Sequence, residues 1–257
     1  MKEELTGIAK AVREAVLPVV GKEGIGKVVG QGADGAPSYE IDRIAEDAAL
    51  AAITASGLNV NILSEESSYV DNKSSETLVM DPVDGSRNAI NGLPFFSISL
   101  AIGSKSLSDV KYGLVMNLIT GDTYYAEKGR GASVNDSVLH TRHFDEKHSV
   151  FLVYVGTHAS ANAYDILRKS SMVRSYGSAA LEMCLVAAGS ADVFYMRAVD
   201  TAHSLRIVDI AASTLIVREA GGEVFDITGN VMDMRFDITD RKSLVAVGDR
   251  AMRRLTL

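Results

Sequence analysis

The segment from Leu78 to Ser99 carries the residues with the clearest chemical potential. Asp81 and Asp84 follow a short apolar run that is typical of an interior strand. Pro82 and Gly85 predict that the chain leaves the sheet in a turn here, which would bring the two carboxylates together. Converging carboxylates repel one another unless a cation lies between them, and Mg²⁺ prefers such oxygen ligands. The segment therefore predicts a magnesium site, although the same pattern is common in surface turns.

The residues that follow the two aspartates predict an anion-binding element. Gly85, Ser86, Arg87 and Asn88 would offer backbone N–H groups and a hydroxyl to an anion if a helix begins at Ser86. A pair of divalent cations about 3.5–4 Å apart can clamp an in-line phosphoryl displacement. Paired carboxylates beside an anion-binding turn therefore favour phosphoryl chemistry.

Further acids are expected to reach the same edge of the sheet. The alternation of residues 58–63 predicts a strand that delivers Glu65 at its end, and pairing with strand 78–80 would bring Glu65 to the same edge as Asp81 and Asp84. Asp209 falls in the first turn of a helix predicted over 207–220, where the helix dipole stabilises a carboxylate.

A long helix predicted to begin near Ser38 carries several acids on one side of an alanine-rich pattern. Asp42 is the candidate functional residue among them, because it lies in the first turn, directly after a glycine-rich segment. The other acids, Glu40, Glu46 and Asp47, are expected on a solvated face.

The composition is that of a globular protein and argues against several classes of partner and site. The 257 residues are 47% hydrophobic and 23% charged, as in an ordinary globular protein. The net charge of −7 argues against a nucleic-acid partner. The single cysteine, Cys184, excludes an intrachain disulfide and lies in an apolar run, so a core position is expected. The chain has no apolar run of about 18 residues, which predicts no membrane partner and a cytoplasmic location.

The order of predicted elements divides the chain into two packed halves. Residues 1–145 read as helices followed by a large, mostly antiparallel sheet, and residues 146–257 read as an α/β half that completes the site. The glycine-rich segment 21–38 favours a hairpin or loop over a helix. It lacks the ending of a nucleotide-binding loop. The five histidines are scattered without metal-site spacing and read as surface or structural residues.

Four segments, taken together, carry a family resemblance: SEESS, DPVDGSRNAINGLPFFSISLA, RSYGSAALEMCLVAAGSADVF and VDIAASTLIVREAGG. In this order they resemble the inositol monophosphatase and fructose-1,6-bisphosphatase superfamily of magnesium-dependent, lithium-sensitive phosphatases. The segment GADGAPSYEIDRIAEDA looks more like the archaeal branch, in which one enzyme often handles both substrates. The resemblance implies a layered α-β-α-β-α sandwich, a homodimer, and hydrolysis by in-line attack of a metal-activated water.

The resemblance also assigns roles to single residues. Two or three Mg²⁺ ions are expected, with Mn²⁺ as a substitute, and the implied ligands are Glu65, Asp81, Asp84, Asp209 and the carbonyl of Val83. The implied catalytic residues are Asp42, Ser86 and Glu65. The implied substrate-binding residues are Asp84, Gly85, Ser86, Arg174, Ser178, Ala179, Arg197 and Asp209. Asp34 matches a mobile segment that helps to recruit a further metal in similar enzymes.

The sequence departs from the family pattern in two places, and two alternative functions remain open. Val208 stands where a tryptophan often precedes the aspartate, and the segment 198–206 looks longer than usual, which blurs the alignment of Arg197 and Arg206. The same chemistry could act on a 3′-phosphoadenosine nucleotide or on NADP. Alternatively, the chain could be a non-catalytic module that binds metal and phosphate.

Overall fold

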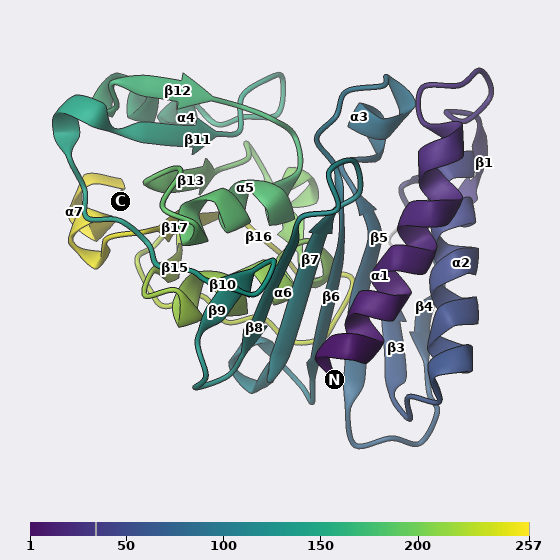
Figure 1. The fold of residues 1–257 in the computed structure, drawn as a ribbon. Coiled ribbons are helices and arrows are strands. Elements are labelled where there is room, and N and C mark those ends of the chain that lie inside the picture. The colour runs from purple at the N-terminus through teal and green to yellow at the C-terminus, as the bar shows by residue number, and fades with distance from the viewer. Residues whose placement is uncertain (34, 257) are drawn as a thin grey trace.

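Helices α1 (Lys2–Val16) and α2 (Glu40–Ser56) pack on one face of a large β-sheet (Figure 1). The structure is a computed structural model and describes residues 1–33 and 35–256. Both helices bury apolar residues spaced three or four positions apart against the sheet. A hairpin of β1 (Val28–Gln31) and β2 (Pro37–Tyr39) precedes α2, as predicted for the glycine-rich segment.

The large sheet is antiparallel except for one parallel pair, β3 and β5. This arrangement confirms the mostly antiparallel sheet predicted for the N-terminal half. Its strands in spatial order are β10 (Ser137–Val138), β9 (Ala132–Val134), β8 (Thr123–Glu127), β7 (Tyr112–Asn117), β6 (Ser97–Gly103), β5 (Thr77–Asp84), β3 (Asn61–Ser64) and β4 (Ser68–Val70).

Two helices, α5 (Ala179–Ala187) and α6 (Ile207–Glu219), fill the space between the large sheet and a smaller one. Both helices are apolar around most of their circumference because they meet a sheet on each side. Gly113 of β7 allows α6 to approach closely, since a Cβ at this position would lie 2.8 Å from the carbonyl oxygen of Ala212. Cys184 is fully buried in this layer, which confirms its predicted core position.

The smaller sheet packs α5 and α6 on one face and α4 (Ala161–Ile166) on the other. Leu152 and Phe194 point toward α5 and α6, whereas their neighbours Phe151 and Val193 point toward α4. The five layers confirm the predicted α-β-α-β-α sandwich. The strands in spatial order are β12 (Met172–Arg174), β11 (Val150–Val153), β13 (Val193–Met196), β17 (Leu244–Val247) and β15 (Glu223–Asp226).

The described chain also contains the short helices α3 (Ser86–Ile90) and α7 (Arg253–Thr256), the paired strands β14 (Leu205–Arg206) and β16 (Arg241–Lys242), and six 3₁₀ helices of three residues each. Strands β12, β11 and β13 are parallel, while β17 and β15 run antiparallel to their neighbours. None of the helices in residues 1–33 and 35–256 is both long and apolar enough to cross a membrane.

Candidate active site

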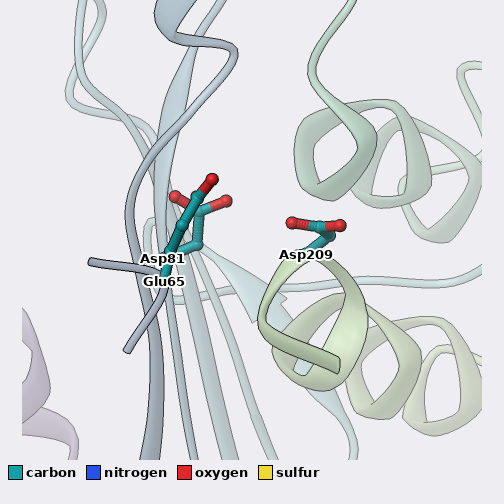
Figure 2. Close-up of side chains that lie close together, drawn as sticks. All are labelled: Glu65, Asp81 and Asp209. Carbon is teal, nitrogen blue, oxygen red and sulfur yellow. The ribbon is translucent and has the colours of Figure 1, made fainter. Parts of the chain in front are cut away.

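Three carboxylates from separate segments lie together where the parallel pairing of β3 and β5 ends (Figure 2). Glu65 directly follows β3, Asp81 lies in β5, and Asp209 lies in the first turn of α6. Ser64 of β3 pairs with Met80 of β5, so the next residue on each strand is an acid. One oxygen from each of the three side chains lies within 4.8 Å of the other two. The structure thus brings Glu65 beside Asp81, as strand pairing predicts.

Asp84 belongs to the same strand as Asp81 but lies outside the group of three acids. Asp81 pairs with Ser99 of β6 and Asp84 pairs with Ser97, so three steps along β5 match two steps along β6. This extra residue is a β-bulge, which bends the strand without ending it. The prediction that the chain leaves the sheet in a turn at Asp81 is therefore wrong, because pairing with β6 continues through Asp84.

The Asp84 carboxylate is held at the N-terminus of α5. It accepts hydrogen bonds from the Ser178 hydroxyl at 2.5 Å, from the Ala180 N–H at 2.7 Å and from the Ala179 N–H at 3.2 Å. Burial raises the pKa of Asp84 to about 7, although these hydrogen bonds favour its ionised form. Ser178 and Ala179, predicted as substrate-binding residues, contact Asp84 directly.

Gly85 and Ser86 connect the bulged strand to α3. Gly85 has φ +94°, and a Cβ there would lie 3.0 Å from the carbonyl oxygen of Gly177. The Ser86 hydroxyl donates to the carbonyl of Val83 at 3.0 Å and also lies in hydrogen-bonding contact with Asp42. Asp42 is 7% exposed and comes from the first turn of α2, so two distant segments meet at Ser86.

A single arginine balances part of the negative charge. Arg206 forms ion pairs with Glu65 and, at 2.8 Å, with Asp209. Burial lowers the pKa of Arg206, but the carboxylates outweigh burial and hold it well above its usual value. Burial raises the pKa of Asp81 well above its usual range, and the neighbouring carboxylates add to this effect. With all three carboxylates ionised, the group would carry more negative charge than Arg206 compensates.

Two buried acids support the loops of the site, and sequence reasoning missed both roles. Glu46 is 4% exposed and accepts hydrogen bonds from the hydroxyls of Ser64 and Ser67, which flank Glu65. Its predicted place on a solvated face is wrong. Its position four residues after Asp42, on the helix face that packs inward, was the available signal. Glu182 accepts hydrogen bonds from backbone N–H groups of the loop before α5. A lone charge in an apolar helix was the signal there.

The two arginines predicted to bind substrate lie at the carboxyl ends of parallel strands, outside the group of three acids. Arg174 ends β12, is exposed, and donates to the carbonyl of Val173 at 2.8 Å. Arg197 follows β13 and lines a cavity of about 540 Å³, together with Arg241 and Lys242. Asp34 lies outside the described residues.

Comparison with known proteins gives a consistent result. A model of the inositol monophosphatase family matches residues 1–256. A fructose-1,6-bisphosphatase/inositol-1-monophosphatase of Methanothermobacter thermautotrophicus is 38% identical over 94% of this chain and 90% of its own. A bifunctional NADP phosphatase/NAD kinase of Methanococcus maripaludis is 33% identical over 99% of this chain and 48% of its own. The solved structure of an inositol monophosphatase-fructose 1,6-bisphosphatase superimposes with a TM-score of 0.88, at 34% identity over 99% of this chain and 97% of its own.

Proposed function

The chain belongs to the inositol monophosphatase family, and from that premise we propose that it hydrolyses a phosphate monoester of inositol or of a sugar. Inositol 1-phosphate and fructose 1,6-bisphosphate are the proposed substrates, by similarity to the relatives that carry both names. The observation that carries the proposal is the group formed by Glu65, Asp81 and Asp209, whose oxygens lie within 4.8 Å of one another. Such a group suits metal-dependent phosphoryl chemistry.

The donor set fits magnesium. Glu65 and Asp209 share one arginine, whereas Asp81 is 2% exposed and accepts only the N–H of Val83, at 3.0 Å, among the described residues. Oxygen donors of this kind are the ligands that Mg²⁺ prefers, and Mn²⁺ could substitute. We propose that Glu65, Asp81, Asp84, Asp209 and the Val83 carbonyl hold two or three ions. When bound, these ions would polarise the phosphoryl oxygens and lower the pKa of a water molecule.

The chain's own groups are proposed to bind the phosphate and orient the water. Backbone N–H groups at Gly85 and Ser86, at the start of α3, would bind phosphate oxygens, and the absent side chain at Gly85 leaves room for them. The Ser86 hydroxyl, held by Asp42, keeps oxygen lone pairs that can accept a hydrogen bond from the attacking water. Asp42, Ser86 and Glu65 are the proposed catalytic residues.

Arginines are proposed to bind the part of the substrate beyond the scissile phosphate. The Arg197 guanidinium makes no hydrogen bond or ion pair within residues 1–33 and 35–256, and it faces a cavity that Arg241 and Lys242 also line. A guanidinium binds phosphate bidentately, so Arg197 and Arg174 suit a second anionic group. Asp84 and Asp209 complete the proposed substrate-binding set, as acceptors for sugar hydroxyls.

NADP is a second candidate substrate. Tyr176 is 39% exposed, and its ring centroid lies 4.7 Å from that of Phe95. Tyr176 also lies two residues before Ser178, which contacts Asp84. An exposed aromatic face next to the site could stack a nucleotide base. The relative named as a bifunctional NADP phosphatase/NAD kinase is consistent with this possibility.

Assays of phosphate release distinguish between these proposed substrates. Inositol 1-phosphate, fructose 1,6-bisphosphate, NADP and 3′-phosphoadenosine 5′-phosphate should each be assayed with Mg²⁺ and with EDTA. We expect metal-dependent turnover of the first two and its loss in Asp84→Asn. Asp47→Asn is a matched control, because Asp47 is exposed on α2. Turnover of the nucleotides alone would favour the NADP alternative, and metal binding without any turnover would favour a binding module.

The homodimer and the cytoplasmic location expected from the sequence stay predictions. Size-exclusion chromatography with light scattering tests the first, with an expected mass of about twice the 27.4 kDa chain. The division into residues 1–145 and 146–257 is likewise a proposal. Expression of each half as a separate chain would test whether either one folds alone.

A further inference from the structure

Arg206 makes unusually extensive contacts with the proposed metal ligands. Its guanidinium contacts the Asp209 carboxylate through two nitrogens, at 2.8 and 3.3 Å, and forms an ion pair with Glu65. Its backbone N–H also donates to Asp209, at 2.7 Å. The side chain is 12% exposed, so these ion pairs are largely shielded from water. A cation of the protein therefore already contacts oxygens that a metal ion would need.

The geometry explains why an arginine can occupy this position. Glu65 and Asp209 come from different segments and face each other across the site (Figure 2). A guanidinium carries its charge on a planar fork, which allows it to contact both carboxylates at once. Removing one partner from a buried ion pair strongly destabilises a protein, because the remaining charge is left uncompensated. Without metal, Arg206 is thus a positive charge that these two acids share.

We propose that Arg206 is a built-in counter-ion that stabilises the metal-free site and competes with the first divalent cation for Glu65 and Asp209. This inference rests on the proposed metal site. A bound cation replaces the contacts of Arg206 with at least one of the two acids, so part of the binding free energy of the metal is used to displace the guanidinium. The arginine therefore sets the metal affinity of the protein below the value that the carboxylates alone would give.

The test compares metal binding by the full chain and by Arg206→Gln after both have been stripped with EDTA. Glutamine removes the charge and keeps the backbone N–H that donates to Asp209. Calorimetric titration with Mn²⁺ or Mg²⁺ should show a Kd for the first ion at least about tenfold lower in the variant, which corresponds to about 1.4 kcal/mol. The melting temperature in EDTA should fall, and the rise on adding Mn²⁺ should exceed that of the unchanged protein.

Arg218→Gln is the matched control. Arg218 lies on the same helix as Asp209 and forms an ion pair with Glu223 at 2.8 Å, away from the three acids. Its replacement should lower the melting temperature without changing the Kd for metal. Arg206→Lys keeps the positive charge and loses the fork, so its Kd should lie between those of the unchanged protein and Arg206→Gln.

An unchanged or weaker affinity in Arg206→Gln would overturn the proposal, because Arg206 would then organise the acids for the metal instead of competing with it. If Arg206→Gln cannot be obtained folded, an Arg206→Lys variant that binds no more tightly than the unchanged protein would overturn it too. Failure of the unchanged protein to bind Mn²⁺ or Mg²⁺ at all would remove the proposed metal site itself. Failure of the proposal about Arg206 is therefore distinguishable from failure of the proposed metal site.

Discussion

Replacing Glu182 with glutamine should remove a pH dependence from the folding stability of the metal-free protein. Glu182 lies in the first turn of α5 and is 4% exposed. Its carboxylate accepts hydrogen bonds from the N–H groups of Tyr176 at 3.0 Å and Gly177 at 3.3 Å. Burial raises the pKa of Glu182 to about 7, and the charge of Asp84 adds to the effect, while these N–H groups oppose it.

The sign of the effect follows from the two pKa values. The folded value of about 7 lies above the value of 4.5 for an unperturbed glutamate. Between these pH values the folded protein keeps a proton that the unfolded chain has lost. The contribution of Glu182 to stability is therefore complete below pH 4.5 and is lost as the pH rises through about 7. At about 1.36 kcal/mol per pKa unit, the difference corresponds to about 3 kcal/mol.

The assay is urea unfolding in EDTA at pH 5, 6, 7 and 8. Between pH 5 and pH 8, the unchanged protein should lose about 2.5 kcal/mol more of its free energy of unfolding than Glu182→Gln does, because part of the total loss already occurs below pH 5. Taking this difference cancels the contributions of the acids that do not interact with Glu182. Glu23→Gln, which changes an exposed glutamate, should behave like the unchanged protein. Parallel curves for the unchanged protein and Glu182→Gln would refute the reasoning, because Glu182 would then titrate normally in the fold.

Three other substitutions test the loops of the site. Gly85→Ala should lower the melting temperature and the rate of phosphate release more than Gly129→Ala does. The two glycines have positive φ, but only at Gly85 does the added Cβ lie close to another backbone atom, so equal losses would contradict this reasoning. Glu46→Ala should lower the free energy of unfolding by about 1–3 kcal/mol, because the buried Ser64 hydroxyl is left without its acceptor, and should also reduce turnover. Asp47→Ala should do neither, and a silent Glu46→Ala would remove its supporting role. Ser86→Ala should lose most of the rate of phosphate release, whereas Ser86→Thr should keep it. Equal losses in the two variants would contradict the proposed role of the hydroxyl in orienting the water.

Much of the fold can be predicted from the sequence because periodicity marks its elements. The apolar spacing over residues 207–220 predicts α6, and strand–helix alternation predicts an α/β second half, while the order of the layers is implied by the family resemblance. The position of Glu65 beside Asp81 was also predictable, since adjacent parallel strands end at one edge. These features depend on local pattern and on a single pairing.

The features that were missed depend on partners remote in the sequence. The segment at Asp81 has the composition of a turn, yet pairing with β6 keeps it in the sheet as a bulge. Glu46 can be buried because two serines donate to it, Ser64 at the end of β3 and Ser67 in the loop that follows. Arg206 has no local pattern at all, and its role follows from the meeting of α6 with the loop that carries Glu65.

The acids of the site differ in how the fold stabilises their charge. Asp42 and Asp209 lie in the first turns of α2 and α6, where each accepts the N–H of the residue that caps its own helix. Asp84 accepts two N–H groups at the start of α5. A helix N-terminus stabilises a carboxylate by about 0.3–1 kcal/mol, and by about 2 kcal/mol in partly buried sites. Asp81 has no such helix and accepts a single N–H from the described residues, although it is the most buried of these acids. Since burial and its neighbours raise the pKa of Asp81, its ionised form depends more than the others on a bound cation.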